Sequence, residues 1–242
     1  MKVVVTGAAS GIGAALCAQL ETAGHAVIGL DIQHGKYVTH RIDLTDPASI
    51  IAIADKIVGP IHGLAHVAGL PGTRPPADIF AVNSLAPKRL TYALEGRLSD
   101  DASIVIVSSV TADRADADQA RSILGGDVQE VDGKTAYELS KRAANIQMLR
   151  LLTEHQPKGR RVNTVSPGTV DTPILQDFVT SIGAEHMARA AAATGGHGDP
   201  ADIAAVIAFM LSPASRWING QVIKVDGGLH GMRAAKAELE MI

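Results

Sequence analysis

The sequence is poor in the residue types that mark several protein classes. It has one cysteine, Cys17, among 242 residues, which excludes an internal disulfide and fits a reducing compartment. Aromatic residues make up only 3% of the chain, so Ala, Val, Ile and Leu have to build the core. That composition is typical of parallel strands covered by alanine-rich helices.

Long runs of one charge or of apolar residues are also missing. The formal net charge is −3 and no basic tract is longer than a pair, so a nucleic-acid groove is not expected. No apolar run approaches the roughly 18 residues that a membrane-spanning helix needs. Met1 leads directly into a β-rich run and not into a signal peptide. We therefore expect a cytoplasmic protein with neither nucleic acid nor a membrane as partner.

Short β-rich apolar runs alternate with segments of helical periodicity along the chain. The β-rich runs occupy residues 2–6, 26–30, 63–69, 103–109, 161–165 and 221–225. The helical segments occupy residues 11–23, 79–97, 136–154 and 200–211. This alternation predicts right-handed crossovers and an α/β fold: a doubly wound, Rossmann-like parallel sheet in a single domain spanning residues 1–242.

Two connections depart from a regular alternation. Only about ten residues separate Asp31 from the next strand-like run, 40–44, and a crossover with its helix needs about 10–12, so that helix is expected to be vestigial or absent. Residues 111–133, by contrast, form a long polar excursion. Within it, 116–124 predicts two helical turns, which Gly125 and Gly126 would end. Its charged side chains argue against a buried core element.

A glycine-rich loop lies between the first strand and the first helix. In "TGAASGIG", Gly7, Gly11 and Gly13 allow a tight turn, so backbone N–H groups and the positive helix start can approach a pyrophosphate. The glycine pattern alone is equally consistent with a plain tight turn. Its place between a strand and a helix favours a dinucleotide site.

An acidic residue follows this loop at the distance expected for ribose recognition. Asp31 ends the second strand, 18 residues after Gly13. A carboxylate there accepts hydrogen bonds from ribose hydroxyls and repels a 2′-phosphate, which favours NAD over NADP. Lys36 and Arg41 nearby would soften that discrimination, and a solvated turn aspartate is the alternative interpretation.

A tyrosine and a lysine one helical turn apart provide a pair for proton transfer. Tyr137 and Lys141 share a helix face in "YELSK". Hydride exchange with a nicotinamide leaves a proton to be moved on the substrate oxygen, and an acid–base group near the working pH is needed for it. A neighbouring ammonium lowers the pKa of a phenol because it stabilises the phenolate.

These motifs, in this order, resemble the compact, single-domain short-chain dehydrogenases/reductases over nearly the whole chain. The matching stretches are "TGAASGIG", Asp31, "IDL", "AHVAG", "FAVNSLAP", "IVIVSSV", "YELSK", "NTVSPGTVDTP" and "NGQVIKVDGG". The layout, with its missing helix and the 28 residues from Ser109 to Tyr137, is similar to bacterial 3α-hydroxysteroid dehydrogenase/carbonyl reductase.

The resemblance implies roles for individual residues. Tyr137 is the acid–base, Lys141 lowers its pKa and binds ribose, Ser109 orients the substrate oxygen, and Asn83 supports a water-linked proton path to Lys141. The implied NAD contacts are Gly7, Ser10, Gly11, Ile12, Gly13, Asp31, Asp43, Leu44, Ala68, Gly69, Tyr137, Lys141, Val170 and Thr172. Asp43 and Leu44 match the adenine contact, and Val170 and Thr172 match the carboxamide contact.

One departure from the family pattern concerns the strand end beside the cofactor. The family usually has two asparagines before the Ala-Gly pair, where His66 and Val67 stand here. We interpret His66 as a packed or capping strand residue, not as a further catalyst. His62 and His66 are too far apart on a strand to bind one metal ion, and no HExxH, CxxC or G-x-S-x-G motif occurs.

The expected activity is NAD-dependent interconversion of a secondary alcohol and a ketone by a homo-oligomer, a dimer or a tetramer. An NAD-sensing regulator without turnover and an NADP-preferring carbonyl reductase are the alternatives.

Segment 187–196, "MARAAAATGG", is expected to be a loop over the substrate with no charged anchor, so a hydrophobic substrate is favoured. The tail after residue 228 is expected to be a solvated helical end, and a contact that closes a neighbouring subunit's site is the alternative. Residues 111–133 are expected to form a lid, and a passive surface excursion is the alternative.

Overall fold

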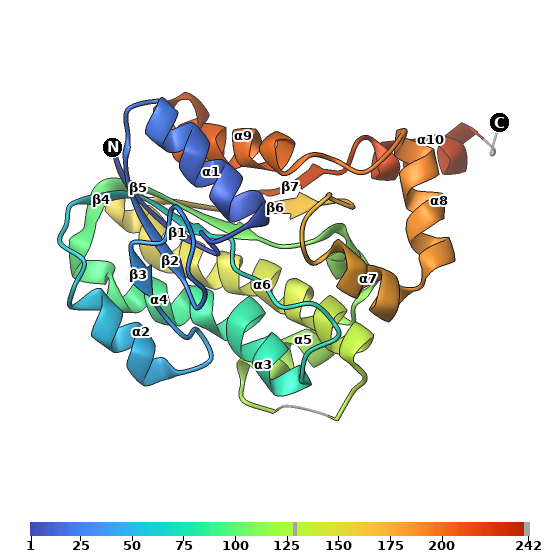
Figure 1. The fold of residues 1–242 in the computed structure, drawn as a ribbon, viewed down its shortest axis with the longest axis horizontal. Helices are drawn as coiled ribbons and strands as arrows, with labels where there is room; N and C mark the ends of the chain where they lie inside the picture. Colours follow the sequence, from blue (N-terminus) through green and yellow to red (C-terminus); the bar gives the residue numbers. More distant parts are fainter. Residues whose placement is uncertain (128–129, 240–242) are drawn as a thin grey trace.

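The chain forms one twisted parallel sheet in a computed structural model that describes residues 1–127 and 130–239 (Figure 1). The strand order is β3-β2-β1-β4-β5-β6-β7, and every neighbouring pair is parallel. The strands are β1 Lys2–Thr6, β2 Ala26–Asp31, β3 His40–Arg41, β4 Ile61–His66, β5 Leu98–Val107, β6 Arg161–Pro167 and β7 Val222–Val225. The predicted doubly wound α/β fold is confirmed.

Helices cover both faces of this sheet. They are α1 Gly11–Thr22, α2 Pro47–Ala54, α3 Pro76–Phe80, α4 Ala86–Ala93, α5 Ala117–Leu124, α6 Gly133–His155, α7 Leu175–Ile182, α8 Ala184–Thr194, α9 Pro200–Leu211 and α10 Leu229–Leu239. Helices α1 and α9 lie on one face, and α2, α4 and α6 on the other (Figure 1). Because side chains alternate along a strand, Val3 and Val5 pack under α1 and α9 while Val4 packs toward α2 and α4.

The four predicted helices are present, with one internal change. The segment predicted at 79–97 divides into α3, a π-helical turn at Ala81–Leu85, and α4. No helix separates β2 from β3, as the short connection predicts. The expectation of a loop at 187–196 is wrong, because the alanines extend α8 as far as Thr194. Gly195, with a φ of 76°, then ends that helix.

The excursion at 111–133 packs partly against the rest of the protein, although its many charged side chains predict that it stays on the surface. It begins as a 3-10 turn, Val110–Arg114, and continues as α5, which Asp116 caps through the N–H groups of Asp118 and Gln119. One face of α5 is apolar: Ala120 and Ile123 are buried against α3 and α6. The prediction that charge keeps the segment out of the core is therefore wrong for this face. Positions 128 and 129 lie outside the described residues.

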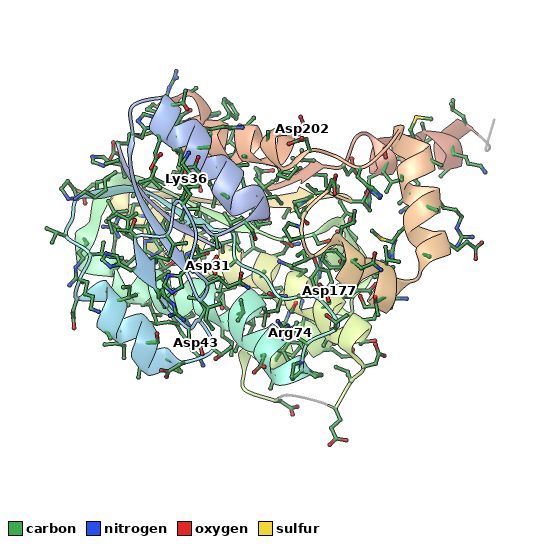
Figure 2. All side chains as sticks on the ribbon, in the orientation of Figure 1. Asp31, Lys36, Asp43, Arg74, Asp177 and Asp202 are labelled. Atoms are coloured by element: carbon green, nitrogen blue, oxygen red, sulfur yellow. The ribbon has the colours of Figure 1, made fainter. Side chains whose placement is uncertain are left out.

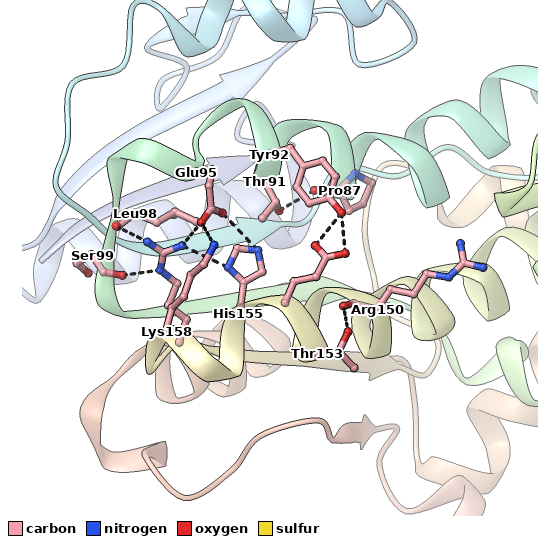
Figure 3. Close-up of polar contacts among 12 residues, drawn as sticks. Pro87, Thr91, Tyr92, Glu95, Leu98, Ser99, Arg150, Thr153, His155 and Lys158 are labelled. Atoms are coloured by element: carbon pink, nitrogen blue, oxygen red, sulfur yellow. Dashed lines mark hydrogen bonds and ion pairs between the residues drawn. The ribbon is translucent and has the colours of Figure 1, made fainter.

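A polar cluster joins the 3-10 turn after α4, Glu95–Arg97, to the end of α6 and the residues that follow it, where β5 begins (Figure 3). Glu95 accepts hydrogen bonds of 2.6 Å from both Lys158 and Arg160, and the ring of His155 lies 3.5 Å from it. Arg160 also donates to the carbonyl groups of Leu98 and Ser99.

Across the described residues, no helix is long and apolar enough to cross a membrane.

Candidate active site

The turn from β1 into α1 forms a backbone cradle. Gly7 and Gly11 have φ values of 75° and 54°, which only glycine adopts without strain. A Cβ on Gly13 would overlap the carbonyl oxygen of Gly7. Ser10 is the N-cap residue but makes no side-chain capping bond, so the first N–H groups of α1 lack a side-chain partner. These features fit a bound pyrophosphate.

Asp31 joins the end of β2 to this cradle. Its Oδ2 accepts a hydrogen bond of 3.0 Å from the N–H of Ala9, and its Oδ1 accepts one of 2.9 Å from Gln33. Each carboxylate oxygen keeps a further lone pair, so the group can still accept from a ligand hydroxyl. Asp31 therefore has a structural role in the loop besides any contact it makes with a cofactor.

A cavity of about 610 Å³ opens at the carboxyl ends of the strands, where doubly wound sheets bind their ligands. It contains every residue predicted to contact the cofactor. Those residues are Gly7, Ser10, Gly11, Ile12, Gly13, Asp31, Asp43, Leu44, Ala68, Gly69, Tyr137, Lys141, Val170 and Thr172. Ser109 also lines the cavity. Figure 2 shows Asp31 and Asp43 on the β2–β3 side and Asp177 in the first turn of α7.

Tyr137 and Lys141 lie side by side on α6, as their spacing predicts. The Lys141 Nζ is 5.7 Å from the centre of the Tyr137 ring and donates a 3.0 Å hydrogen bond to the carbonyl of Val107. Both side chains are buried, with 8% of Tyr137 and 4% of Lys141 exposed. The Ser109 hydroxyl accepts from the N–H and hydroxyl of Thr111 at 3.2 and 3.1 Å.

Burial governs the ionisation of this pair. It raises the pKa of Tyr137 to about 12, and the hydrogen bond with Ser109 opposes that increase. It lowers the pKa of Lys141 to about 8. Desolvation is the largest influence on the pKa of Tyr137, and it acts opposite to the lowering by Lys141 that the resemblance implies.

Asn83 does not line the cavity but holds the loop that does. It lies in the π-helical turn, where its Oδ1 accepts from the N–H of Leu70 at 2.8 Å and its Nδ2 donates to the carbonyl of Leu70 at 3.0 Å. The same Nδ2 donates to the hydroxyl of Ser140, which in turn donates to the carbonyl of Tyr137. A π-helical turn is a frequent feature of functional sites, and the apolar periodicity of the sequence does not predict it.

His66 is a packed residue, as interpreted from the sequence. It is 4% exposed, does not line the cavity, and pairs through Nε2 with the Thr91 hydroxyl at 3.0 Å. That hydroxyl donates to the carbonyl of Pro87, so the Nε2 of His66 carries the proton and donates to Thr91. Burial lowers the pKa of His66 to about 3, which keeps the ring neutral.

The structure adds cavity residues that sequence reasoning missed. The Phe178 ring contacts Tyr137 edge to face, with ring centres 5.1 Å apart. Leu229 and Arg233, in the tail predicted to be solvated, also line the cavity. Arg74 lines it from the loop between β4 and α3, and Arg114 from the end of the 3-10 turn Val110–Arg114. No spacing rule could identify these residues, because the fold alone brings them to the cavity.

Comparison with known proteins gives matches over nearly the whole chain. Residues 7–230 match the family described as enoyl-(acyl carrier protein) reductase. The chain is 36% identical to coniferyl-alcohol dehydrogenase of Pseudomonas sp. (strain HR199 / DSM 7063), covering 94% of this chain and 96% of that protein. It is 31% identical to 3-alpha-hydroxysteroid dehydrogenase/carbonyl reductase of Comamonas testosteroni, covering 94% and 95%.

A solved structure is similar throughout. The 3-alpha-hydroxysteroid dehydrogenase from Pseudomonas sp. B-0831, crystallised with NADH, superposes with a TM-score of 0.87 at 32% identity. The match covers 98% of this chain and 99% of that one.

Proposed function

The chain belongs to the short-chain dehydrogenase/reductase family, and from this premise we propose that it interconverts a secondary alcohol and a ketone with NAD as cofactor. It is an oxidoreductase of the type that acts on alcohols and ketones. The observation that carries the proposal is the convergence of Ser109, Tyr137 and Lys141 on one cavity whose other end is the glycine cradle. NAD, when bound there, exchanges a hydride with the substrate carbon.

The chain's own residues handle the proton. Tyr137 takes the proton of the alcohol during oxidation and returns it during ketone reduction. Ser109 orients the substrate oxygen by a hydrogen bond, and Lys141 stabilises the phenolate and binds ribose. Asn83 acts as a positioning residue, since its contacts run to Leu70 and Ser140.

The proposed preference for NAD rests on Asp31. Its carboxylate has lone pairs for the ribose hydroxyls and repels a 2′-phosphate at the same position. Arg41, which pairs with Asp31 across β2 and β3, could favour a 2′-phosphate by its charge. Its Nε–H donates a hydrogen bond to the carbonyl of Ile32, and that bond restrains the side chain. The NADH in the similar Pseudomonas dehydrogenase supports the same preference.

The proposed substrate is a hydrophobic alcohol or ketone with an aromatic, alicyclic or steroid skeleton. Phe178, which contacts Tyr137, gives the cavity an apolar wall together with Ile182, Met187 and Leu229. Relatives named for coniferyl alcohol and for 3-alpha-hydroxysteroids support this class. We also propose that the protein is a cytoplasmic homo-oligomer, a dimer or a tetramer, which light scattering would measure.

We expect the purified protein to form NADH from NAD with members of an alcohol panel. The panel contains aryl, alicyclic and steroid secondary alcohols, and NADH formation is followed by absorbance. The same panel with NADP should react more slowly, because of Asp31. If NADH binds but no alcohol or ketone is turned over, the proposal is wrong and the NAD-sensing alternative replaces it.

A second expectation concerns the excursion, which we propose to act as a lid through its first turn. Val110, Thr111 and Arg114 line the cavity, whereas no residue of α5 does. Replacing residues 116–127 by a short glycine linker should leave NADH affinity unchanged, because the cradle and Asp31 lie elsewhere. It should raise the KM for bulky alcohols, since Val110–Arg114 loses its anchor, or change the subunit count.

Two measurements distinguish the lid from a passive excursion. Circular dichroism establishes that the shortened chain is folded despite exposing the α3–α6 surface that Ala120 and Ile123 cover. Kinetics with small and bulky alcohols and mass by light scattering then follow. If neither the KM values for the alcohols nor the mass in solution changes, the excursion is passive.

A further inference from the structure

The cavity wall opposite Asp31 combines apolar side chains with arginines. Asp31 ends β2 near one edge of the sheet, whereas α10 follows β7 at the other edge (Figure 1). On that side α7, α8 and α10 contribute Phe178, Ile182, Met187, Ala190 and Leu229. The arginines of the cavity are Arg74, Arg114 and Arg233. Such a wall suits a ligand with an apolar body and a negatively charged end.

The three arginines differ in their partners. Arg114 lies 3.8 Å from the carboxylate of Glu138. Next to Arg74, Thr73 donates to Asp177, which places a carboxylate on the same stretch of cavity wall (Figure 2). Among residues 1–127 and 130–239, neither Arg74 nor Arg233 has an ion-pair partner. Arg233 therefore adds a positive charge to the wall that no described carboxylate offsets by direct contact.

Helix α10 is anchored at its first turn, and the exposed Arg233, one turn further on, is among the residues that line the cavity. Asp226 accepts from the N–H of His230 at 3.0 Å and from its Nδ1 at 2.6 Å, which holds the first turn of the helix. The other ring nitrogen of His230 lies 3.7 Å from Asp113, which Lys224 also binds at 2.5 Å. Leu229, 7% exposed, and Arg233 are four residues apart, so they share the face toward the cavity.

We propose that Arg233 binds an anionic oxygen group at the end of the substrate remote from the reacting carbon. The group is a carboxylate of the substrate itself or a phosphate of an attached carrier. A guanidinium beside apolar walls loses hydration when a hydrophobic ligand enters, and an anion compensates for that loss by charge-assisted hydrogen bonds. The inference rests on the proposed function, because it takes the alcohol end of the ligand to lie at Tyr137.

The test compares acids with their neutral esters. Substrates are 4-hydroxycyclohexanecarboxylate and homologues with one to four methylenes before the carboxylate, each beside its methyl ester. In Arg233→Gln, kcat/KM for the preferred acid should fall roughly 10- to 100-fold, mainly through KM, while that for the ester changes less than about twofold. Arg189→Gln is the matched control, since Arg189 lies on α8, pairs with Glu185 and does not line the cavity.

A second pair of substrates identifies the source of the anion. A 3-hydroxyacyl-coenzyme A thioester is compared with its N-acetylcysteamine thioester, which has no phosphate. A loss in Arg233→Gln that is confined to the coenzyme A thioester supports the Arg233 site and assigns it to a carrier phosphate. The assignment is overturned if two results hold together. Arg233→Gln changes kcat/KM equally for acids and esters, or for neither, and it changes kcat/KM equally for the two thioesters.

Binding without turnover separates this inference from the proposed activity. The Kd of 4-cyclohexylbutanoate for the NADH-loaded protein, measured by calorimetry, should rise in Arg233→Gln and stay constant in Arg189→Gln. If that holds while no alcohol is oxidised, the anion site stands and the proposed activity is wrong. If alcohols are oxidised but neither this Kd nor the relative kcat/KM of the two thioesters changes in Arg233→Gln, the anion site is wrong and the activity stands.

Discussion

Tyr137→Phe is expected to lower turnover by roughly 10²- to 10⁴-fold, the range for loss of a positioned acid–base group. NADH affinity should be preserved, because the substitution removes only the hydroxyl. The phenylalanine ring keeps the edge-to-face contact with Phe178, so the folded structure should also be retained. Steady-state kinetics in both directions and NADH binding by fluorescence would measure the two effects separately.

Tyr92→Phe is the matched control for this substitution. The Tyr92 hydroxyl donates to the carboxylate of Glu154 on the exposed side of α6, and it is not a cavity residue (Figure 3). Turnover in Tyr92→Phe should equal that of the unmodified protein. Near-normal turnover in Tyr137→Phe would contradict the role assigned to the phenol.

The pH dependence tests the same assignment. Oxidation needs the phenolate, and burial raises the pKa of Tyr137 to about 12, so the reactive form is scarce at neutral pH. The oxidation rate should therefore increase from neutral to alkaline pH. Loss of the Lys141 proton near its pKa of about 8 should make the increase shallower above that pH, because it removes positive charge beside the phenolate. A flat profile would mean that another step limits the rate.

The sequence was sufficient for those parts of the fold that depend on local periodicity and on turn chemistry. The β-rich runs predicted the central strands, and the spacing after Asp31 predicted the missing helix. The cradle was predictable because only glycine has the conformational freedom that Gly7 and Gly11 use. Tyr137 and Lys141 were predictable as neighbours because helix geometry sets their spacing.

The remaining features depend on tertiary contacts that no single segment encodes. The π-helical turn around Asn83 changes the hydrogen-bond pattern of a helix without changing its apolar period. Ile123 is buried because α3 and α6 meet α5, although its neighbours are charged. Arg233 lines the cavity from α10, whose first turn is held by the contact between Asp226 and His230. The raised pKa of Tyr137 likewise follows from burial, which the pairing with Lys141 did not predict.

Asp31→Ala is expected to reverse or erase the preference for NAD. Removing the carboxylate removes a ribose interaction of about 1.5–3 kcal/mol, which corresponds to roughly a 10- to 150-fold change in affinity for NAD. Affinity for NADP should increase relative to NAD, because the repulsion of the 2′-phosphate is lost as well. The dissociation constants of both reduced cofactors, measured by fluorescence, give the ratio directly.

The ratio matters more than either affinity, because Asp31 also accepts from Ala9 and Gln33. Its loss loosens the cradle, and a purely structural effect would weaken NAD and NADP binding equally. Asp43→Asn is the control: Asp43 also lines the cavity, but its Oδ1 accepts from Thr45 and it matches the adenine contact. The NAD-to-NADP ratio should fall in Asp31→Ala and remain constant in Asp43→Asn. Equal kinetics with both cofactors in the unmodified protein would exclude the role of Asp31 in selecting NAD.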